Sequence, residues 1–374
     1  MRILWDFDGT IMDTYPTMIQ AAIRAIEEQG KTISSEELLR RMKRSSVYAF
    51  TSLDLDPTET LQKMVEIEQT LPNQQKQPFS YIREVLKLAE CNVIYTHKSR
   101  KLVEELLDEY QLNEYFTEVV CQEDGFARKP DTPAYEYLQA KYGINLVIGD
   151  RELDLEPARK LGIQTCAFQN EEIEADYHLS SYVEFPLVLL GETYGVIPNS
   201  KTSPILSTEW LQTYFSPTDM RYQHILGVVQ KANKSPESYL HDVGYSPSLI
   251  RTGFHPIDGA IYALEHGFEL DVIMAILFHG GADGEAQLHG GKIREMYEKL
   301  SKFVTTSQQE RIDFLTYCDI HTSPDGQTIT IEERLADIWS RYNVETVVYQ
   351  NMKQQVPYLM KLRKKYAHDT FSKD

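Results

Sequence analysis

The sequence predicts two domains of different class, an α/β domain with a Rossmann-like parallel sheet and an all-α domain after it. The chain has 374 residues, about twice the commonest domain length. Short apolar strands alternate with helical patterns up to about residue 185, and beyond a stretch rich in Gly, Pro, Ser and Thr only helical patterns follow. We therefore place the domains at 1–190 and 207–374, with a linker at 191–206.

Short apolar runs separated by helical segments predict the α/β fold of the first half. The predicted strands are residues 2–7, 92–95, 118–121, 146–148 and 164–168. This alternation is typical of a parallel sheet covered by helices. Between the first two strands, residues 14–77 have almost only helical patterns, and we interpret this segment as an inserted helical cap.

The second half is predicted to be helical throughout. Its periodic apolar patterns cover residues 220–231, 256–266, 271–278, 291–303, 307–318, 331–342 and 352–367. The predicted class of this domain is therefore all-α.

Composition excludes several classes of function. A formal net charge of −18 argues against duplex nucleic acid as a partner, since a phosphate backbone is met by clustered Lys and Arg. No run approaches the ~20 apolar residues of a membrane helix, and no secretory signal precedes the first strand, so we expect a cytoplasmic protein without a membrane partner. The four cysteines form no C-x-x-C pair, which argues against a disulfide framework or a thiolate zinc site.

Polar residues suited to phosphate chemistry follow the predicted strands. Ligands of a parallel sheet bind at the carboxyl ends of its strands. Phosphoryl transfer needs a nucleophile, a cation for the phosphoryl oxygens, a proton donor and a metal ion. The candidate residues are Asp6, Asp8, Thr96, Lys129, Asp150 and Asp154.

Each residue type suits one of these tasks. Asp6 and Asp8 lie two apart on an extended segment, so both side chains point the same way. Lys129 supplies a point charge for phosphate, and Thr96 offers a hydroxyl and backbone donors at a helix start. Asp150 offers oxygen ligands for a hard cation.

The order of these motifs resembles the haloacid dehalogenase superfamily over residues 1–190. The segments that carry the resemblance are Asp6-Phe7-Asp8-Gly9-Thr10, Thr96, Lys129-Pro130 and Gly149-Asp150-Arg151-Glu152-Leu153-Asp154. The resemblance implies an aspartyl-phosphate on Asp6, with Asp8 as general acid and then base and with Thr96 and Lys129 as catalytic partners. It also implies a Mg²⁺ site, with Asp6, Asp8 and Asp150 as candidate ligands. Asp154 either supports the metal or orients Lys129.

A phosphatase fits this pattern better than a dehalogenase, because a dehalogenase needs neither the acid at Asp8 nor a metal. The first half resembles the phosphoglycolate phosphatase-like branch, which is catalytically broad, and we expect a small phosphorylated metabolite or nucleotide as substrate. The basic residues of the predicted cap either recognise an anionic group or coat a helix, and we favour the coat. These residues are Arg40, Arg41, Lys43 and Arg44.

Potential metal ligands gather in the second half. Imidazole and carboxylate ligands suit Fe, Mn or another divalent metal, and six of them are enough for two ions. The six are His224, His241, Asp242, His255, His279 and Asp319.

The sequence around these ligands resembles the HD-domain superfamily of metal-dependent phosphohydrolases over about residues 205–370. The segments that carry this resemblance are Tyr239–Pro247, Thr252–Ala260 and Cys318-Asp319. The order H…HD…H…H…D resembles the two-metal branch, which includes phosphodiesterases and a few di-iron oxygenases.

Two features depart from that branch. His224 precedes His241 by too few residues for two helices to fold back easily, which argues against His224 as a ligand. Gly280 stands where a further ligand might follow His279, so one metal and two metals both remain open.

The leading interpretation is a bifunctional hydrolase with a phosphomonoesterase half and an HD-type phosphohydrolase half. One alternative makes the second half a noncatalytic module that senses a nucleotide or holds a homodimer. Another makes it an iron oxygenase acting on a phosphonate or polyol.

Overall fold

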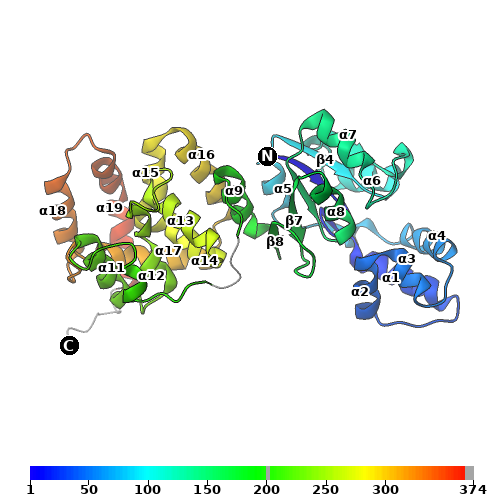
Figure 1. Cartoon of the computed structure of the whole chain (residues 1–374), viewed down its shortest axis with the longest axis horizontal. Coiled ribbons are helices and arrows are strands. Elements are labelled where there is room, and N and C mark those ends of the chain that lie inside the picture. Colours follow the sequence, from blue (N-terminus) through cyan, green and yellow to red (C-terminus); the bar gives the residue numbers. More distant parts are fainter. Residues whose placement is uncertain (199–202, 367–374) are drawn as a thin grey trace. The chain divides into compact units, whose positions relative to one another are not determined.

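The computed structural model describes residues 1–198 and 203–366 and divides the chain into two compact units, Met1–Phe185 and Pro186–Asp374 (Figure 1). The predicted linker at 191–206 begins inside helix α9 (Phe185–Tyr194), because the helix continues past Gly191. Positions 199–202 of that linker and positions 367–374 of the predicted second domain lie outside the described residues. The predicted last helix therefore ends, at residue 367, just beyond the described chain.

The first unit contains a six-stranded parallel sheet in the order β5-β4-β1-β6-β7-β8. Its strands are β1 (Arg2–Trp5), β4 (Cys91–Tyr95), β5 (Glu118–Val120), β6 (Leu146–Gly149), β7 (Gln164–Phe168) and β8 (Tyr177–Leu179). The predicted parallel α/β fold is confirmed, while β8 was not among the predicted strands. β1 pairs with both β4 and β6, so the segment after β1 lies at the centre of the sheet's carboxyl edge.

Helices connect these strands in sequence order. They are α1 (Tyr15–Glu27), α2 (Ser35–Arg44), α3 (Ser46–Thr51), α4 (Pro57–Glu68), α5 (Ile82–Leu86), α6 (Arg100–Glu109), α7 (Pro133–Tyr142) and α8 (Glu152–Lys160). Buried side chains of β1, β4 and β6 pack with α7 and α8 in one apolar core. This core fixes the strand ends that carry the candidate site.

Helices α1 to α4 form the inserted cap. The insertion leaves the sheet domain at β2 (Met12–Asp13) and returns at β3 (Gln77–Pro78), which pairs with β2 in antiparallel fashion. The cap has its own apolar core, to which Ala22, Leu38 and Phe50 contribute with no exposed surface. A two-strand connection and a separate core make the cap a subdomain over the sheet edge.

The second unit is helical, as predicted, and its described residues form no β-strand beyond one isolated bridge. Its helices are α9, α10 (Thr208–Leu211), α11 (Met220–Lys231), α12 (Pro236–Leu240), α13 (His255–Glu265), α14 (Leu270–Phe278), α15 (Ala282–His289), α16 (Gly291–Leu300), α17 (Thr306–Ile320), α18 (Ile331–Arg341) and α19 (Val347–Lys365). α14 is buried over almost its whole length, which makes it the centre of this unit. Among residues 1–198 and 203–366, no helix combines the length and apolarity needed to cross a bilayer.

Candidate functional sites

The carboxyl edge of the sheet holds a buried chain of two carboxylates and one ammonium. Asp6 directly follows β1, and its backbone N–H donates to Ile148 O at 3.0 Å, which fixes it beside β6. Lys129 Nζ donates to Asp6 Oδ1 at 2.6 Å and to Asp154 Oδ1 at 2.8 Å. All three side chains are almost inaccessible to solvent. The sequence-predicted residues Asp6, Lys129 and Asp154 are therefore brought together.

Burial and neighbouring charges have opposite effects on the pKa values of these linked side chains. Burial alone would lower the pKa of Lys129, but Asp154 and Asp6 raise it above its ordinary value. The pKa of Asp6 is raised, first by burial and then by repulsion from Asp154, although Lys129 opposes both effects. Lys129 therefore carries a positive charge where the phosphoryl oxygens of a substrate bound at Asp6 would need one.

Asp150 has an unsatisfied oxygen directed into the same region. Tyr15 donates its hydroxyl to Asp150 Oδ2 at 2.8 Å, whereas Asp150 Oδ1 is buried without a hydrogen-bond partner. Burial raises the pKa of Asp150 to about 7. Asp6, Asp150 and Asp154 each present an oxygen within 4.8 Å of the others. A hard divalent cation fits this set, because it would satisfy the orphaned oxygen and replace the proton.

Both oxygens of Asp154 are already engaged. Oδ1 accepts from Lys129, and Oδ2 accepts from the backbone N–H of Arg151 at 3.1 Å. A Cβ atom on Gly149 would lie 2.5 Å from Asp154 Cβ, so this close approach needs glycine. Of the two roles left open for Asp154, the geometry favours orientation of Lys129 over metal ligation.

Asp8 is not a member of the group formed by Asp6, Asp150 and Asp154, so its role as a metal ligand stays a prediction. Asp8 Oδ1 accepts from Lys98 Nζ at 3.0 Å, and Lys98 Nζ also donates to Glu68 Oε1 at 3.1 Å. Burial opposes the charge on Lys98, but Asp8 and Glu68 raise its pKa above the ordinary value. Sequence reasoning missed Lys98 and Glu68; the position of Lys98, two residues after Thr96, was the available signal.

Thr96 and His97 shape the turn after β4. Thr96 is buried, and its hydroxyl accepts from the backbone N–H of Lys98 at 3.1 Å. His97 Nε2 accepts from the backbone N–H of Lys129 at 3.0 Å. Burial, together with Lys129, lowers the pKa of His97 to about 3. The imidazole is therefore neutral and fixes the backbone from which Lys129 extends.

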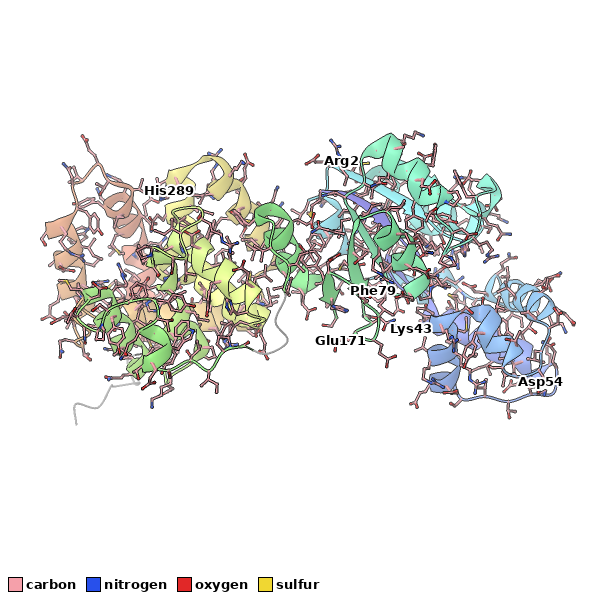
Figure 2. The ribbon with its side chains drawn as sticks, viewed as in Figure 1. Arg2, Lys43, Asp54, Phe79, Glu171 and His289 are labelled. Carbon is pink, nitrogen blue, oxygen red and sulfur yellow. The ribbon has the colours of Figure 1, made fainter. Side chains whose placement is uncertain are left out.

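A groove of about 730 Å³ runs between α1 and α2 beside this site, with Tyr15, Ile19, Ile23 and Leu39 among its lining. Lys43, which Figure 2 labels, also lines this groove. Its Nζ donates to Gln169 O at 2.9 Å and lies 5.8 Å from the ring centroid of Tyr15. The other three basic cap residues bind neighbours on the cap itself: Arg40 and Arg41 pair with Glu37, and Arg44 stacks on Tyr48. The expected coat is thus correct for these three, and Lys43 is the exception.

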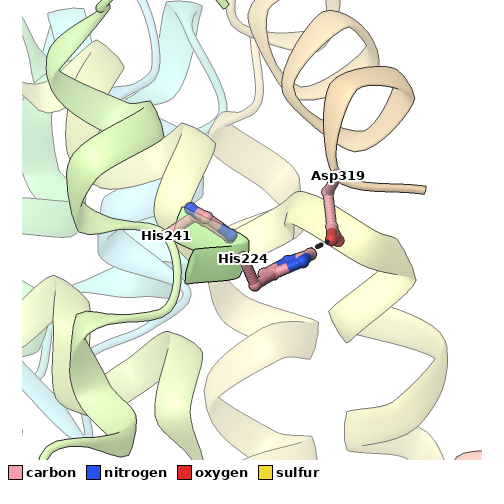
Figure 3. Close-up of side chains that lie close together, drawn as sticks. All are labelled: His224, His241 and Asp319. Carbon is pink, nitrogen blue, oxygen red and sulfur yellow. Dashed lines mark hydrogen bonds and ion pairs between the residues drawn. The ribbon is translucent and has the colours of Figure 1, made fainter. Parts of the chain in front are cut away.

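In the second unit, His224, His241 and Asp319 come together at one site (Figure 3). His224 Nε2 lies 3.0 Å from Asp319 Oδ1. The expectation that His224 lies too close in sequence to reach this group is therefore wrong. Asn233 and Lys234 adopt left-handed backbone conformations, with φ of 51° and 56°, and reverse the chain between α11 and α12 in a few residues.

Asp242 joins this group to a second one, formed with His255 and His279. Its Oδ1 lies 3.4 Å from His255 Nε2 and 3.8 Å from His279 Nε2. Its Oδ2 lies 3.6 Å from His241 Nε2 and 3.7 Å from His224 Nε2. All six predicted ligands therefore surround one region, and a single carboxylate faces four imidazoles.

Backbone carbonyls fix the tautomers of three of these histidines. A carbonyl oxygen accepts hydrogen bonds only, so an Nδ1 bound to one must carry the hydrogen. The Nδ1 atoms of His224, His241 and His279 bind Ser323 O at 3.1 Å, Ser238 O at 2.8 Å and Ile276 O at 2.6 Å. With Nδ1 bound in this way, each ring leaves its Nε2 facing the region between the six residues, the arrangement that metal-binding histidines adopt.

The electrostatics of this region also suit a cation. His241 Nε2 is buried without a partner, and burial lowers the pKa of His241 to about 4. Burial works against ionised Asp242, yet Arg221 and the surrounding histidines hold its pKa well below the ordinary value. Arg221, which sequence reasoning missed, contacts Asp242 and lies 4.0 Å over the ring of Tyr245, which in turn stacks on His255.

Comparisons with known proteins place the first half in a family. The model of haloacid dehalogenase-like hydrolases matches residues 3–168. PpaX from Caldanaerobacter subterraneus subsp. tengcongensis, assigned as a pyrophosphatase, is 26% identical over 175 residues, which cover 44% of this chain and 80% of that protein. The phosphoglycolate phosphatase of Vibrio parahaemolyticus is 24% identical over 181 residues, covering 43% of this chain and 79% of that protein.

Among solved structures, a hydrolase from Streptococcus pneumoniae TIGR4 is 28% identical, with a TM-score of 0.35, and the match covers 46% of this chain and 93% of that one. The family match spans the cap and the sheet as far as β7, and it contains Asp6, Lys129 and Asp150. The N-terminal half of the chain is therefore a haloacid dehalogenase-like hydrolase domain, and its homologues indicate a hydrolase acting on phosphoric ester bonds.

Proposed function

We propose that the first unit hydrolyses small phosphomonoesters through an aspartyl-phosphate on Asp6. The observation that carries this proposal is the buried ammonium of Lys129, 2.6 Å from Asp6 Oδ1 and held from its other side by Asp154. A carboxylate nucleophile with a fixed cation beside it is preorganised to receive an anionic phosphoryl group.

The reaction has two steps in which Asp6 and Asp8 exchange bonds and protons with the substrate. A carboxylate oxygen of Asp6 attacks phosphorus, the bond from phosphorus to the leaving oxygen breaks, and Asp8 protonates that oxygen. Asp8 then takes a proton from a water molecule that attacks phosphorus. The bond from phosphorus to Asp6 breaks, inorganic phosphate leaves, and both carboxylates return to their starting state.

A Mg²⁺ ion fits the set formed by Asp6 and Asp150, whose orphaned Oδ1 marks the place for it. When bound, the ion neutralises part of the phosphoryl charge. In that arrangement Lys129 supplies a second positive charge, and Asp154 keeps Lys129 directed at Asp6. Tyr15 holds the other oxygen of Asp150 and so fixes the plane of its carboxylate.

The proposed substrate is a small phosphorylated metabolite or nucleotide whose leaving group lies beneath the cap. The similar proteins are named as phosphoglycolate phosphatases and a pyrophosphatase, and both names describe small anionic esters or anhydrides. The groove beside Tyr15 has a volume in the range of small-molecule sites. Lys43 contributes a positive charge to its lining, and Ile19 and Leu39 contribute apolar surface. This supports a leaving group with a polar end and an apolar part.

The test compares phosphate release from a panel of phosphomonoesters with Mg²⁺ for the full chain and for Asp6→Asn. Asp54→Asn is the matched control, because this aspartate is exposed on the cap. We expect release to be lost in Asp6→Asn and retained in the control, and intact-mass measurement after acid quenching should detect the phosphorylated protein. Undiminished release by Asp6→Asn would exclude Asp6 as nucleophile.

For the second unit we propose an HD-type metal-dependent phosphohydrolase. This proposal rests on the position of Asp242 between four imidazoles, three of which have tautomers fixed by backbone carbonyls. Fe, Mn or another divalent metal suits such a mixed nitrogen and oxygen set, and two groups of ligands support two ions sharing Asp242. A single ion at His224, His241 and Asp319 is the alternative that Gly280 leaves open.

Metal analysis of the purified chain separates these possibilities. Two equivalents that fall to none in His241→Ala/Asp242→Ala support a dinuclear site, and one equivalent supports the mononuclear alternative. Cleavage of phosphodiesters to an alcohol and a phosphomonoester that survives Asp6→Asn would support hydrolysis by this unit. Oxygen consumption after Fe²⁺ loading would instead favour an oxygenase, and metal binding without turnover would favour a sensing or dimerisation module.

A further inference from the structure

A lysine between the cap and the sheet domain links the candidate acid Asp8 to a buried carboxylate of the cap. Lys98 Nζ lies 3.0 Å from Asp8 Oδ1 and 3.1 Å from Glu68 Oε1. The side chains of Lys98 and Glu68 are 7% and 4% exposed, and that of Asp8 is 16% exposed. Removing one partner of such a buried ion pair is costly, because it leaves an uncompensated charge.

The backbone around Lys98 is held on both sides, so its ammonium has little freedom. Its N–H donates to Thr96 Oγ1 at 3.1 Å, and its carbonyl accepts from the backbone N–H of Gln122 at 3.3 Å. Glu68 is held as well, since it ends α4 and its carbonyl accepts from Lys76 Nζ at 3.3 Å. Lys98 therefore joins Glu68 of the cap to Asp8, and both Lys98 and Glu68 are held in place. Of these three residues, Asp8 is the one that must face a leaving group.

We propose that Lys98 and Glu68 are positioning residues, which together direct Asp8 toward the leaving-group oxygen only while the cap covers the sheet edge. The inference rests on the proposed function, in which Asp8 is the general acid. Lys98 engages Oδ1 of Asp8 and leaves Oδ2 for the leaving oxygen, and a general acid must lie within hydrogen-bond distance of the atom that it protonates. Because Glu68 belongs to the cap, it can hold Lys98 only while the cap covers the sheet edge.

This role predicts a dependence on the leaving group that mere structural damage would not produce. An aryl phosphate such as p-nitrophenyl phosphate leaves as a weakly basic oxygen and needs little protonation, whereas an alkyl phosphate such as glycerol phosphate needs the acid. Misdirection of Asp8 therefore slows the alkyl ester selectively. Loss of Lys129 or a general loss of folding would slow both esters.

The experiment measures kcat and KM of the full chain for both esters with Mg²⁺. In Glu68→Gln, kcat for glycerol phosphate should fall about tenfold, while kcat for p-nitrophenyl phosphate stays within about twofold. In Lys98→Met, kcat for the alkyl ester should fall further, since Asp8 and Glu68 then repel each other. In Lys98→Arg, part of this loss in kcat should be recovered. Glu66→Gln is the matched control, because Glu66 is exposed on the same helix.

Equal losses for both esters, or none, in Glu68→Gln would overturn the proposal. Hydrogen exchange of the same variants supplies a readout that needs no turnover. Glu68→Gln and Lys98→Met should exchange faster than Glu66→Gln in the β2–β3 connection, because the cap has lost its buried anchor. If the unsubstituted chain hydrolyses neither ester, the proposed function fails. Unchanged exchange would then also rule out Lys98 and Glu68 as the link between cap and acid.

Discussion

The two candidate sites use aspartate in opposite electrostatic settings. In the first unit, burial dominates and raises the pKa of Asp150 to about 7, with one oxygen left unsatisfied. In the second unit, burial is outweighed by Arg221 and the histidines, and the pKa of Asp242 is lowered. The comparison shows that an aspartate can be suited to a cation in two ways. Asp150 has a buried oxygen without a hydrogen-bond partner, whereas the negative charge of Asp242 is already stabilised by its neighbours.

The neighbours of these aspartates differ in the same sense. The sheet-edge site offers oxygen ligands and balances them with the ammonium of Lys129. The helical site offers imidazole nitrogens, three of them on rings oriented by backbone carbonyls, and it pairs Asp242 with the guanidinium of Arg221. Oxygen ligands favour Mg²⁺, and mixed nitrogen and oxygen ligands favour Fe, Mn or Zn. The predictions below test whether the sites are as separate as this difference implies.

The largest expected effect is a double dissociation between the units. Asp6→Asn should lower phosphate release from small monoesters by on the order of 10³-fold or more, because a nucleophile acts in every turnover. The same variant should keep the metal content of the second unit. His241→Ala/Asp242→Ala should show the reverse, with metal lost and release within about twofold of normal. Release that falls in both variants would show that the two sites depend on each other.

A second prediction concerns metal preference. Calorimetric titration of the chelator-treated chain should resolve binding of Mn²⁺ or Zn²⁺ that is at least about 100-fold tighter than binding of Mg²⁺. This tight component should vanish in His241→Ala/Asp242→Ala, since its ligands are imidazoles. Phosphate release should be restored by Mg²⁺ alone. If Mg²⁺ competed equally for the tight component, the assignment of different metals to the two sites would be wrong.

Close packing beside the helical site gives a third, smaller effect. A Cβ on Gly244 would lie 2.1 Å from His255 O and 2.7 Å from Gly259 N, both backbone atoms that cannot turn away. Gly244→Ala should therefore lower the free energy of unfolding of the helical unit by about 2–3 kcal/mol in denaturant titration. Gly259→Ala is the comparison, since the atoms nearest to its new Cβ, the Ile276 Cγ2 methyl and Leu240 O, would both lie at 3.2 Å. An equal loss in the two variants would contradict the contact argument.

The sequence anticipated the sheet-edge residues because they directly follow strands. Asp6 and Asp150 come after β1 and β6, which are neighbours in the sheet, so spacing along the chain translates directly into proximity. Lys98 and Glu68 escaped notice because their pairing joins the cap to the sheet, and no local pattern records a contact of that kind. Tyr15 was missed for a similar reason, since its partner Asp150 lies far along the chain.

The helical site was anticipated from residue types, but its geometry was misjudged at one point. Rise per residue suggested that α11 and α12 could not fold back, whereas Asn233 and Lys234 make the reversal with left-handed backbone angles. Residues other than glycine adopt such angles rarely, and asparagine is among the more tolerant ones. The carbonyl partners that fix the histidine tautomers have no sequence signature at all, because any residue offers the same backbone oxygen.

The smallest predicted effect asks how far the first site depends on a neutral imidazole, which is the group that dominates the second. The pKa of His97 is about 3 in the folded chain, lowered by burial and by Lys129, against about 6.5 when unfolded. Between these values the unfolded chain binds more protons, so the free energy of unfolding contributed by His97 is complete above pH 6.5 and falls as the solution is acidified. His97 is only partly buried, so we expect about 1 kcal/mol between pH 7 and pH 5.

His97→Gln isolates this contribution, because the glutamine amide oxygen can still accept from the Lys129 N–H but does not titrate. The fluorescence of buried Trp5 reports on the first unit once Trp210 and Trp339 are replaced by Phe, because these substitutions remove the tryptophan signal of the second unit. In this background the variant should lose about 1 kcal/mol less than the parent on acidification. Parallel losses would mean that His97 is protonated with little cost, and that the Lys129 backbone is held by other contacts.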